Sequence, residues 1–520
     1  MSLARDVATV GAATLLSRLL GFIRDAGIAA VLGAGVLSDA FFAALQIPNL
    51  FRRLLAEGAL NAAFVPMWLR LRDEAGPRGA RRFGEATLGT MLVVLGITAL
   101  LCMLFAPIVV RIIAPGFRIE GERFALAVDY VRLSIPYVAV AGLVAVTAAV
   151  LNAEGRVGAA AFGLVVFNAV FVAAVASVIF LGAQASAFAG ALLSAAVVLA
   201  GIAQLVLVGA AVLRLANPPV RPRLTPWDNV RRFFAQAVPG VVAGGIPQLK
   251  LMAGAMVASA SQSAVSWLYY ANRLYELPLG VVSIAISAVL VPRIAASVRA
   301  GEEQAVSAAQ SRAFEIALGL ALPAAVAFAL LAEPIAGGLF ERGAFGPRDT
   351  AAVAGALAAI SAGLPGHVLE KVLGAVSFAH EDTRTPMFAA LAGLAAAVTG
   401  ALLMFPHYGH VGIAGAIAVS GWIGAATLAV VLTRRRWLRF EHDLGRRLGM
   451  IVAATLAMSA TLYALRHPLV PWYAAGAAWP LRVAALAILV TAGLLVYSGL
   501  LHIFGVARVG DVIAAVRRRI

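Results

Sequence analysis

The chain contains a single cysteine, Cys102, and few charged residues for its 520-residue length. One cysteine excludes an intrachain disulfide and any metal site built from several cysteines. Only 13% of the residues are charged and 62% are hydrophobic, whereas soluble domains have about 25% charged and 45–50% apolar residues. With a mean hydropathy of +0.93, this composition predicts an all-α polytopic membrane protein.

The usual signatures of enzymes are also missing from the sequence. It has no Walker A motif, no Ser/His/Asp grouping and no pair of Asp-rich loops of the kind used by metal-dependent transferases. His407 and His410 form a short pair without a neighbouring carboxylate, which is typical of a solvated loop. We therefore expect a protein that is not an enzyme and binds no metal or cofactor.

Fourteen apolar stretches are long enough to cross a bilayer. They cover residues 6–32, 37–66, 86–113, 123–151, 158–182, 186–213, 228–259, 263–292, 310–332, 350–379, 386–406, 411–433, 447–465 and 481–505. The first stretch contains arginines in its apolar part and is not followed by a small-residue cleavage site. It does not resemble a signal peptide, so we expect it to be retained.

The formal net charge is +16, from 41 Lys+Arg against 25 Asp+Glu. In a soluble protein this excess would suggest a nucleic acid partner. Here the basic residues gather in connections between apolar stretches, which is a topology signal, and we expect no nucleic acid partner. If the N-terminus is cytoplasmic, roughly 26 basic residues fall on the cytoplasmic side and about 7 on the outer side. Both termini are therefore predicted to be cytoplasmic.

A weak internal repeat suggests how the helices are grouped. FVP at 64–66 recurs as LVP at 290–292, and LNAEGR at 151–156 recurs as FAHEDTR at 378–384. The spacing fits a unit of six helices in each copy. We expect a six-helix lobe at 1–226, a second six-helix lobe at 227–440, and two additional helices at 441–520. Two lobes around a central cavity are typical of an alternating-access transporter.

The first two apolar stretches carry seven ionisable side chains between residues 18 and 66. They are Arg18, Arg24, Asp25, Asp39, Arg52, Arg53 and Glu57. Each charge costs about 2.5–3.5 kcal/mol at the centre of a membrane helix, so such residues face a wet cavity or pair with one another. Arg18 and Asp25 are two turns apart on one helix face, and Asp25 can orient an arginine. The spacing of Arg53 and Glu57 predicts a structural ion pair.

Arginine is the preferred cation in these stretches and in the later sequence WLYYANRLYELP, which contains Arg273 and Glu276. The planar guanidinium group matches a phosphate bidentately and stays charged at any physiological pH. The pattern therefore favours an anionic phosphate or pyrophosphate headgroup as the ligand. The alternative is that these arginines extend to the interface or pair structurally with the nearby carboxylates.

Three motifs carry a resemblance to a known family. The stretch RDAGIAAVLGAGVLSDAFFAALQIPNLFRRLLAEGALNAAFVP at 24–66, together with SWLYYANRLYELPLGVV and HEDTRTP, resembles the MurJ (MviN) family. That family belongs to the superfamily of multidrug, oligosaccharidyl-lipid and polysaccharide exporters, and the resemblance covers essentially the whole chain. It implies a flippase that moves lipid II, an undecaprenyl-pyrophosphate-linked peptidoglycan precursor, from the cytoplasmic to the periplasmic leaflet.

The resemblance also implies roles for individual residues. Arg18, Arg24, Arg52 and Arg273 would line a central cationic cavity that binds the pyrophosphate headgroup, and Asp25, Asp39 and Glu57 match acidic positions of the family motif. Asp39 and Glu57 would close a gate by pairing with an arginine in one state, and the last two helices would form a groove for the lipid tail. We expect a monomer in the bacterial cytoplasmic membrane, in contact with membrane lipids and with cell-wall synthesis or division proteins.

Other functions remain open at this point. A flippase for another polyprenyl-pyrophosphate-linked glycan has the same requirements, whereas an arginine-lined cavity would repel a cationic drug. A non-transporting scaffold for cell-wall synthesis would not explain buried arginines. Some family members are thought to use a sodium site with carboxylates in helices 7 and 11. The central parts of the corresponding stretches, 236–258 and 387–405, contain no Asp or Glu. Coupling to the membrane potential is the alternative.

Overall fold

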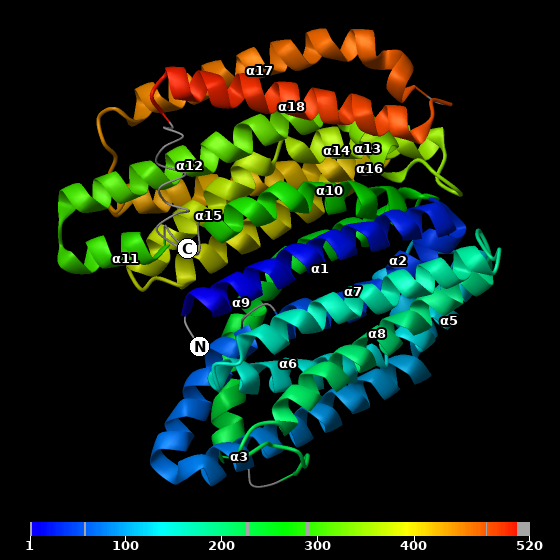
Figure 1. Cartoon of the computed structure of the whole chain (residues 1–520), viewed down its shortest axis with the longest axis vertical. Helices are drawn as coiled ribbons and strands as arrows, with labels where there is room; N and C mark the ends of the chain where they lie inside the picture. The colour runs from blue at the N-terminus through cyan, green and yellow to red at the C-terminus, as the bar shows by residue number, and fades with distance from the viewer. Residues whose placement is uncertain (1–2, 57–58, 225–227, 286–290, 475, 507–520) are drawn as a thin grey trace. The chain divides into compact units, whose positions relative to one another are not determined.

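The computed structural model describes residues 3–56, 59–224, 228–285, 291–474 and 476–506, and the regular secondary structure in these residues is α-helical (Figure 1). The predicted all-α membrane fold is confirmed. The chain forms two compact units. The first comprises Met1–Ser266 with Arg342–Phe345, and the second comprises Trp267–Glu341 with Gly346–Ile520.

The first unit is built from the helices that precede residue 266. They are α1 (Leu3–Leu32), α2 (Val36–Ala56), α3 (Ala59–Leu104), α4 (Ala106–Ile113), α5 (Glu122–Ser134), α6 (Tyr137–Ala153), α7 (Val157–Phe180), α8 (Ala187–Leu213), α9 (Asp228–Ala258) and the first turn of α10 (Ala264–Ala285). Helix α1 packs against α7, α7 against α8, and α6 against both α3 and α8. Helix α9 packs against α3 and α2.

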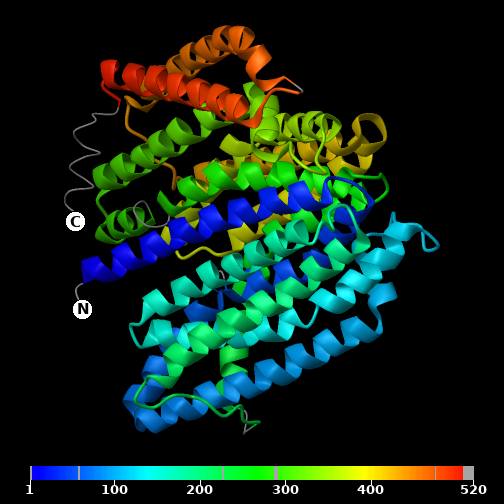
Figure 2. The ribbon, with the colours of Figure 1, turned by 45° about the vertical axis from the view of Figure 1, so that its right-hand side comes forward.

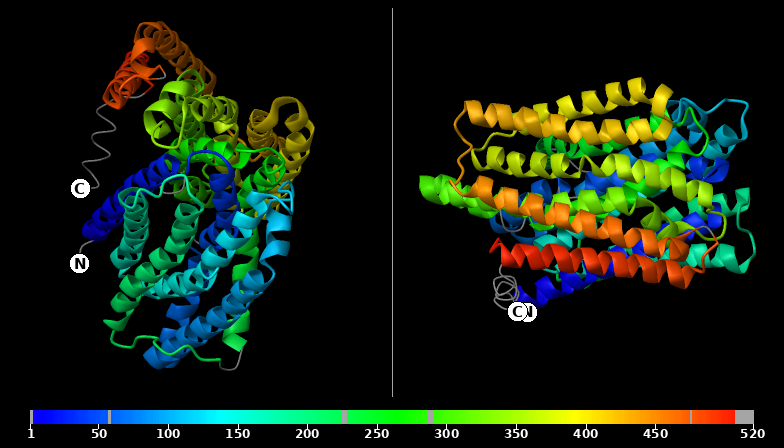
Figure 3. Two further views of the ribbon diagram at one scale, coloured as in Figure 1. Left: turned by 90° about the vertical axis from the view of Figure 1, so that its right-hand side faces the viewer. Right: turned by 90° about the horizontal axis from the view of Figure 1, so that it is seen from above.

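The second unit contains the rest of α10 and the helices that follow. They are α11 (Val291–Ala300), α12 (Glu303–Leu330), α13 (Ala332–Phe340), α14 (Pro347–Ser361), α15 (Leu364–Ala379), α16 (Arg384–Arg434), α17 (Leu444–Tyr473) and α18 (Trp479–Ile503). Helix α15 packs against α16 and α12, and α12 also contacts α17. Helices α17 and α18 lie side by side as an antiparallel pair (Figures 2 and 3).

Two helices differ from the predicted stretches because their backbone is not helical at a glycine. The predicted stretch 37–66 covers most of α2, which is described to Ala56, and the beginning of α3, which is described from Ala59. Helix α3 then continues through Gly76, whose φ of 70° and ψ of −179° are not helical. The predicted stretches 386–406 and 411–433 form one run, α16, which is interrupted at Gly409 with a φ of 55°. Glycine tolerates these positive φ values without a Cβ clash.

The surface of the helices is apolar where a soluble protein would be polar. On α3, Val94, Ile97, Leu101 and Leu104 are 51%, 52%, 49% and 63% exposed, and their spacing places them on one helix face. A long exposed apolar stripe of this kind faces lipid. Nine helical runs of the described residues are long and apolar enough to cross a membrane. The number of fourteen crossings stays a prediction.

Residues of α9 contact helices of the first unit, so the compact units divide the chain at residue 266. The lobe boundary at 226, which we inferred from the internal repeat, stays a prediction. In the second unit, α18 is fixed by a buried ion pair in which Arg482 Nη1 lies 2.9 Å from Glu341 Oε1. Glu341 Oε2 accepts a hydrogen bond of 2.7 Å from Thr350 on α14. The last two helices are therefore attached to the rest of their unit through a buried polar contact as well as by apolar packing.

Candidate functional site

Arg24 on α1 is the most firmly held of the predicted ligand-binding arginines. Its Nε and Nη2 atoms donate to Asp25 Oδ1 at 2.9 and 2.8 Å, and its Nη1 donates to Asn168 Oδ1 at 3.0 Å. The guanidinium carbon lies 5.5 Å from the ring centroid of Phe171. The Arg24 side chain is 16% exposed and Asp25 is fully buried. The Asp25 carboxylate thus holds the guanidinium group of its neighbour Arg24.

Asn168 is a residue that we did not single out from the sequence. It belongs to α7, and its Nδ2 donates to the backbone oxygen and to Oγ of Ser17 at 3.0 and 3.1 Å. Because its Oδ1 accepts from Arg24, the amide connects two points of α1 to α7. The sequence does contain a sign that Asn168 is important, because Asn168 and Ser177 are the two polar residues among the 24 residues of α7. A buried amide inside an apolar helix requires partners.

Arg18 and Arg52 belong to the first unit, as Arg24 does. Arg52 and Arg53 are half-buried in the last turns of α2. Arg18 is half-buried on α1, two turns before Asp25. Unit 1 thus holds three of the four predicted ligand-binding arginines, on α1 and α2.

The other predicted site residues stand as follows. Arg273 lies on the part of α10 that belongs to the second unit, where its Nη1 is 3.4 Å from Glu276 Oε2. Glu276 Oε1 accepts from Asn272 at 3.1 Å, so this arginine is also oriented by a neighbouring carboxylate. Glu57 lies outside the described residues, so the predicted pair between Arg53 and Glu57 stays a prediction.

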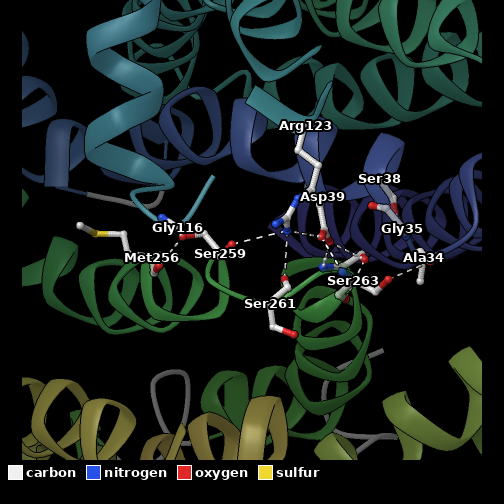
Figure 4. Close-up of polar contacts among 11 residues, drawn as sticks. Ala34, Gly35, Ser38, Asp39, Gly116, Arg123, Met256, Ser259, Ser261 and Ser263 are labelled. Carbon is white, nitrogen blue, oxygen red and sulfur yellow. Dashed lines mark hydrogen bonds and ion pairs between the residues drawn. The ribbon is translucent and has the colours of Figure 1, made fainter. Parts of the chain in front are cut away.

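Asp39, in the first turn of α2, is fully buried and accepts several hydrogen bonds from the start of α10 (Figure 4). Its Oδ2 accepts from the backbone N–H of Ser263 at 2.7 Å. Its Oδ1 accepts from the backbone N–H and the hydroxyl of Ser266 at 3.0 and 2.8 Å. The first N–H groups of a helix have no partner within that helix. The Asp39 carboxylate therefore acts as an N-terminal cap supplied by another helix, and its negative charge matches the helix dipole.

The cation that pairs with Asp39 is Arg123 of α5, at 3.5 Å between Nη1 and Oδ2. Arg123 Nη1 also donates to the backbone oxygen of Ser261 at 3.1 Å, and its guanidinium carbon lies 4.8 Å from the ring centroid of Phe117. The sequence pattern placed Arg123 only among outer-side charges, because it is remote from Asp39 along the chain. We call Asp39, Arg123, Ser261, Ser263 and Ser266 the Asp39 cluster. It joins three segments of the first unit through polar contacts.

A second polar group lies within the second unit, where Tyr275 Oη is 2.8 Å from His367 Nδ1. His367 Nδ1 is also 3.0 Å from the backbone oxygen of Gly363, one turn earlier on α15. Glu370, on the same helix, packs against Gly424 of α16, where an added Cβ would lie 2.8 Å from Glu370 Oε1. Among the described residues, no three His, Cys, Asp or Glu side chains are grouped closely enough to bind a metal ion.

The motif HEDTRTP forms the connection between α15 and α16. Asp382 accepts hydrogen bonds from the backbone N–H groups of Arg384 and Thr385 at 3.0 and 3.1 Å, and from the Thr385 hydroxyl at 2.5 Å. It also pairs with Arg435 just beyond the other end of α16. Partial burial raises the pKa of Asp382, but the hydrogen bonds from Thr385, Arg435 and Arg384 outweigh it and lower the pKa to about 2. The motif is therefore a helix cap combined with an ion pair.

Comparisons with known proteins agree over nearly the full chain. A family sequence model described as "Lipid II flippase MurJ" matches residues 28–498. A protein of Rhizobium meliloti named "Probable lipid II flippase MurJ" is 41% identical over 527 residues, which cover 100% of this chain and 97% of that protein.

Two solved structures of transporters resemble the fold. "Lipid II flippase MurJ, inward closed conformation" has a TM-score of 0.79 and 21% identity, covering 95% of this chain and 98% of that one. A multidrug resistance MATE family transporter of the MOP superfamily, in an inward-facing conformation, has a TM-score of 0.66 and 15% identity, covering 81% and 94%. At these identities the likeness shows a shared fold.

Proposed function

Because this chain belongs to the MurJ family, we propose that it is a lipid II flippase of the bacterial cytoplasmic membrane. It moves the undecaprenyl-pyrophosphate-linked peptidoglycan precursor from the cytoplasmic to the periplasmic leaflet by alternating access. The lipid tail stays in the bilayer and only the polar headgroup crosses. The observation that carries the proposal is the family match across the chain, together with the buried, oriented Arg24 on a membrane helix.

Arginines are the residues that bind the headgroup in this proposal. Arg24 presents a guanidinium group held by Asp25 and Asn168, and Arg52 is a second half-buried arginine of the same unit. A pyrophosphate has enough charged oxygens to accept from both side chains. Arg18 and Arg273 belong to the same set by resemblance, and we expect each to contribute to binding.

The Asp39 cluster is the gating element that we propose. Its carboxylate is satisfied by groups of two other segments, the start of α10 and α5, so a change of conformation that separates these segments from α2 must exchange those partners. Glu57 is the second candidate for the gate, and Arg53 is its predicted partner. The same proposal includes a monomer with both termini in the cytoplasm. It also includes a lipid-tail groove at α17 and α18, and contacts with cell-wall synthesis or division proteins.

A second candidate is a flippase for another polyprenyl-pyrophosphate-linked glycan. The oriented arginines recognise the pyrophosphate, which both substrates share, so binding at Arg24 does not distinguish them. A scaffold without transport activity would not need arginines that are oriented inside a membrane helix.

Complementation tests the proposal. A host is depleted of its own lipid II flippase and supplied with this chain, with Arg24→Ala, with Arg273→Ala, or with Arg70→Ala as a matched control. Arg70 is 54% exposed and pairs with Glu74, one turn later on the same helix. Its replacement therefore removes one positive charge outside the proposed site.

We expect cells with the unchanged chain or with Arg70→Ala to grow. Cells with Arg24→Ala or Arg273→Ala should lyse, although the membrane contains the same amount of each protein. A well-inserted unchanged chain that fails to rescue would indicate a different glycan. Full rescue by both site variants would contradict the arginine-based mechanism while leaving the transport function intact.

A further inference from the structure

The second unit contains a polar cavity of about 430 Å³ that the proposed transport mechanism does not use. It lies between α12, the start of α17 and the residues that follow α18. Its charged lining residues are Arg312, Glu315, Arg446 and Arg447. The basic sequence that connects α16 to α17, with Arg434 and its neighbours, adjoins this end of the unit. This is the side that the charge distribution predicts to be cytoplasmic.

Glu315 is the buried polar group of the cavity. It is 4% exposed, and its Oε1 accepts from Arg312 Nη1 at 2.8 Å. Its Oε2 lies 3.6 Å from Arg447 Nη1 and accepts no hydrogen bond from the described residues. Buried carboxylate oxygens normally accept hydrogen bonds, and one that does not retains the capacity to accept from a ligand.

The arginines at the rim are available to an anion. Arg446 is 67% exposed and lies 3.7 Å from Asp443, and Arg447 is 31% exposed and lies 3.1 Å from Glu441. The ion pair of Arg446 with Asp443 is exposed and stabilises the protein little, so Arg446 can exchange Asp443 for a phosphate. Arg447 also pairs with Glu315, and its guanidinium group has further N–H donors for the same phosphate. Arginine binds phosphate bidentately, and basic pockets between membrane helices on the cytoplasmic side suit lipid headgroups.

The cavity lining also has an apolar part. Met450 and Phe504 belong to it. Ile503, next to Phe504 at the end of α18, is 75% exposed. A ligand that places a phosphate between Arg446 and Arg447 therefore has apolar side chains beside it, which suit the acyl chains of a lipid.

We propose that this cavity binds the headgroup of a glycerophospholipid that carries a hydrogen-bond donor beyond its phosphodiester. The phosphodiester lies at Arg446 and Arg447, and the donor, an ammonium or a hydroxyl, lies at Glu315 Oε2. Phosphatidylethanolamine and phosphatidylglycerol have such a donor. Phosphatidylcholine does not, because its quaternary ammonium has no N–H. The site is separate from the arginines proposed for lipid II and does not depend on transport.

Lipid titration of the purified full-length protein, followed by native mass spectrometry, tests the proposal. The probes are phosphatidylethanolamine, phosphatidylglycerol and phosphatidylcholine with identical acyl chains, and inorganic phosphate as a competitor. We expect phosphatidylethanolamine and phosphatidylglycerol to bind roughly tenfold more tightly than phosphatidylcholine, because phosphatidylcholine cannot form the hydrogen bond to the charged Glu315. Inorganic phosphate at the same concentrations should not displace them.

Two variants assign the effect to the cavity. Arg446→Gln should weaken binding of the donor-bearing lipids by about threefold or more, since an exposed charge-assisted contact is removed. Arg299→Gln removes the same charge from an exposed arginine on α11, outside the cavity lining, and should bind as the unchanged chain does. Glu315→Gln should reduce the preference over phosphatidylcholine.

Equal affinity for the three lipids, or equal effects of Arg446→Gln and Arg299→Gln, would overturn the proposal. Displacement of the lipids by inorganic phosphate would assign the cavity to a free anion and would also overturn it. If Glu315→Gln does not fold, the comparison of the two arginine variants still decides the outcome.

Discussion

At the scale of single residues, Arg24 depends on more than its acidic neighbour. Asp25 is adjacent in sequence, and neighbouring residues of a helix point about 100° apart, so this pair alone does not fix the direction of the guanidinium group. Asn168 fixes it from a second helix, because its Oδ1 accepts from Arg24 Nη1 while its Nδ2 is held by Ser17. Asn168 is therefore a positioning residue for the proposed pyrophosphate site.

The substitution Asn168→Ala removes the acceptor of Arg24 Nη1. A hydrogen bond to a charged group contributes about 1.5–3 kcal/mol, so we expect lipid II to bind roughly tenfold more weakly, with the helices intact. Binding of lipid II to the purified variant measures this directly. Ser177→Ala is the control, because the Ser177 hydroxyl bonds only to the Ala173 oxygen of its own helix. Equal affinities of the two variants would show that Asn168 does not position Arg24.

Asp39 is expected to control stability as well as gating. In Asp39→Asn one carboxylate oxygen becomes an NH2 group, which then faces N–H donors of Ser263 or Ser266. Arg123 also loses its anionic partner. Breaking a buried ion pair costs about 3–5 kcal/mol, so the unfolding temperature in detergent should fall clearly.

Asp129→Asn provides the comparison for Asp39→Asn. Asp129 is 66% exposed and lies 3.7 Å from Arg132, so its neutralisation should change the free energy of unfolding by less than about 0.5 kcal/mol. Similar unfolding temperatures for the two variants would mean that the Asp39 cluster does not stabilise this conformation.

At the scale of helices, hydropathy and charge spacing predict where the elements are but not which side chains meet. The apolar stretch 158–182 was predicted to be a helix, and α7 covers Val157–Phe180. The contact between Asn168 and Arg24 joins residues 144 positions apart, and the contact between Asp39 and Arg123 joins residues 84 apart. Neither spacing has a helical period, so a local pattern cannot reveal these pairs.

The connection between α15 and α16 provides a pH-dependent test at the same scale. The pKa of Asp382 is about 2 in the folded protein, below its ordinary value of 3.8. A carboxyl group with a lowered pKa adds stability that is present above its unfolded pKa and is lost as the pH falls through the folded pKa. We therefore expect Asp382→Asn to lower the unfolding temperature at pH 7, and this difference to shrink between about pH 4 and pH 2.

Unfolding temperatures of both proteins across that pH range measure the effect. Glu381→Gln is the matched control, because Glu381 adjoins Asp382 in the same connection and its side chain is exposed. A difference between Asp382→Asn and the unchanged chain that stays constant down to pH 2 would mean that the Asp382 charge does not hold the start of α16.

At the scale of the whole molecule, we infer the energy source for transport from the charged residues of the proposed site. Arg24 on α1 and Arg52 on α2 are cations that we propose to line the transport site, while residues 236–258 and 387–405 contain no Asp or Glu for a sodium site of the kind attributed to some relatives. A charge that moves across the membrane potential gains about 2.3 kcal/mol per 100 mV. An inside-negative potential would therefore favour the return of an empty cationic site toward the cytoplasm.

We expect flipping in proteoliposomes to accelerate when an inside-negative potential is imposed and to slow when valinomycin and equal potassium concentrations collapse it. Replacing sodium with choline should leave the rate unchanged at constant potential. Arg24→Gln should reduce the voltage dependence in addition to the affinity, because one of the moving charges is gone, whereas Arg70→Gln should not. A flipping rate that depends on the sodium concentration and not on the membrane potential would contradict this mechanism. It would mean that sodium binds at residues outside 236–258 and 387–405.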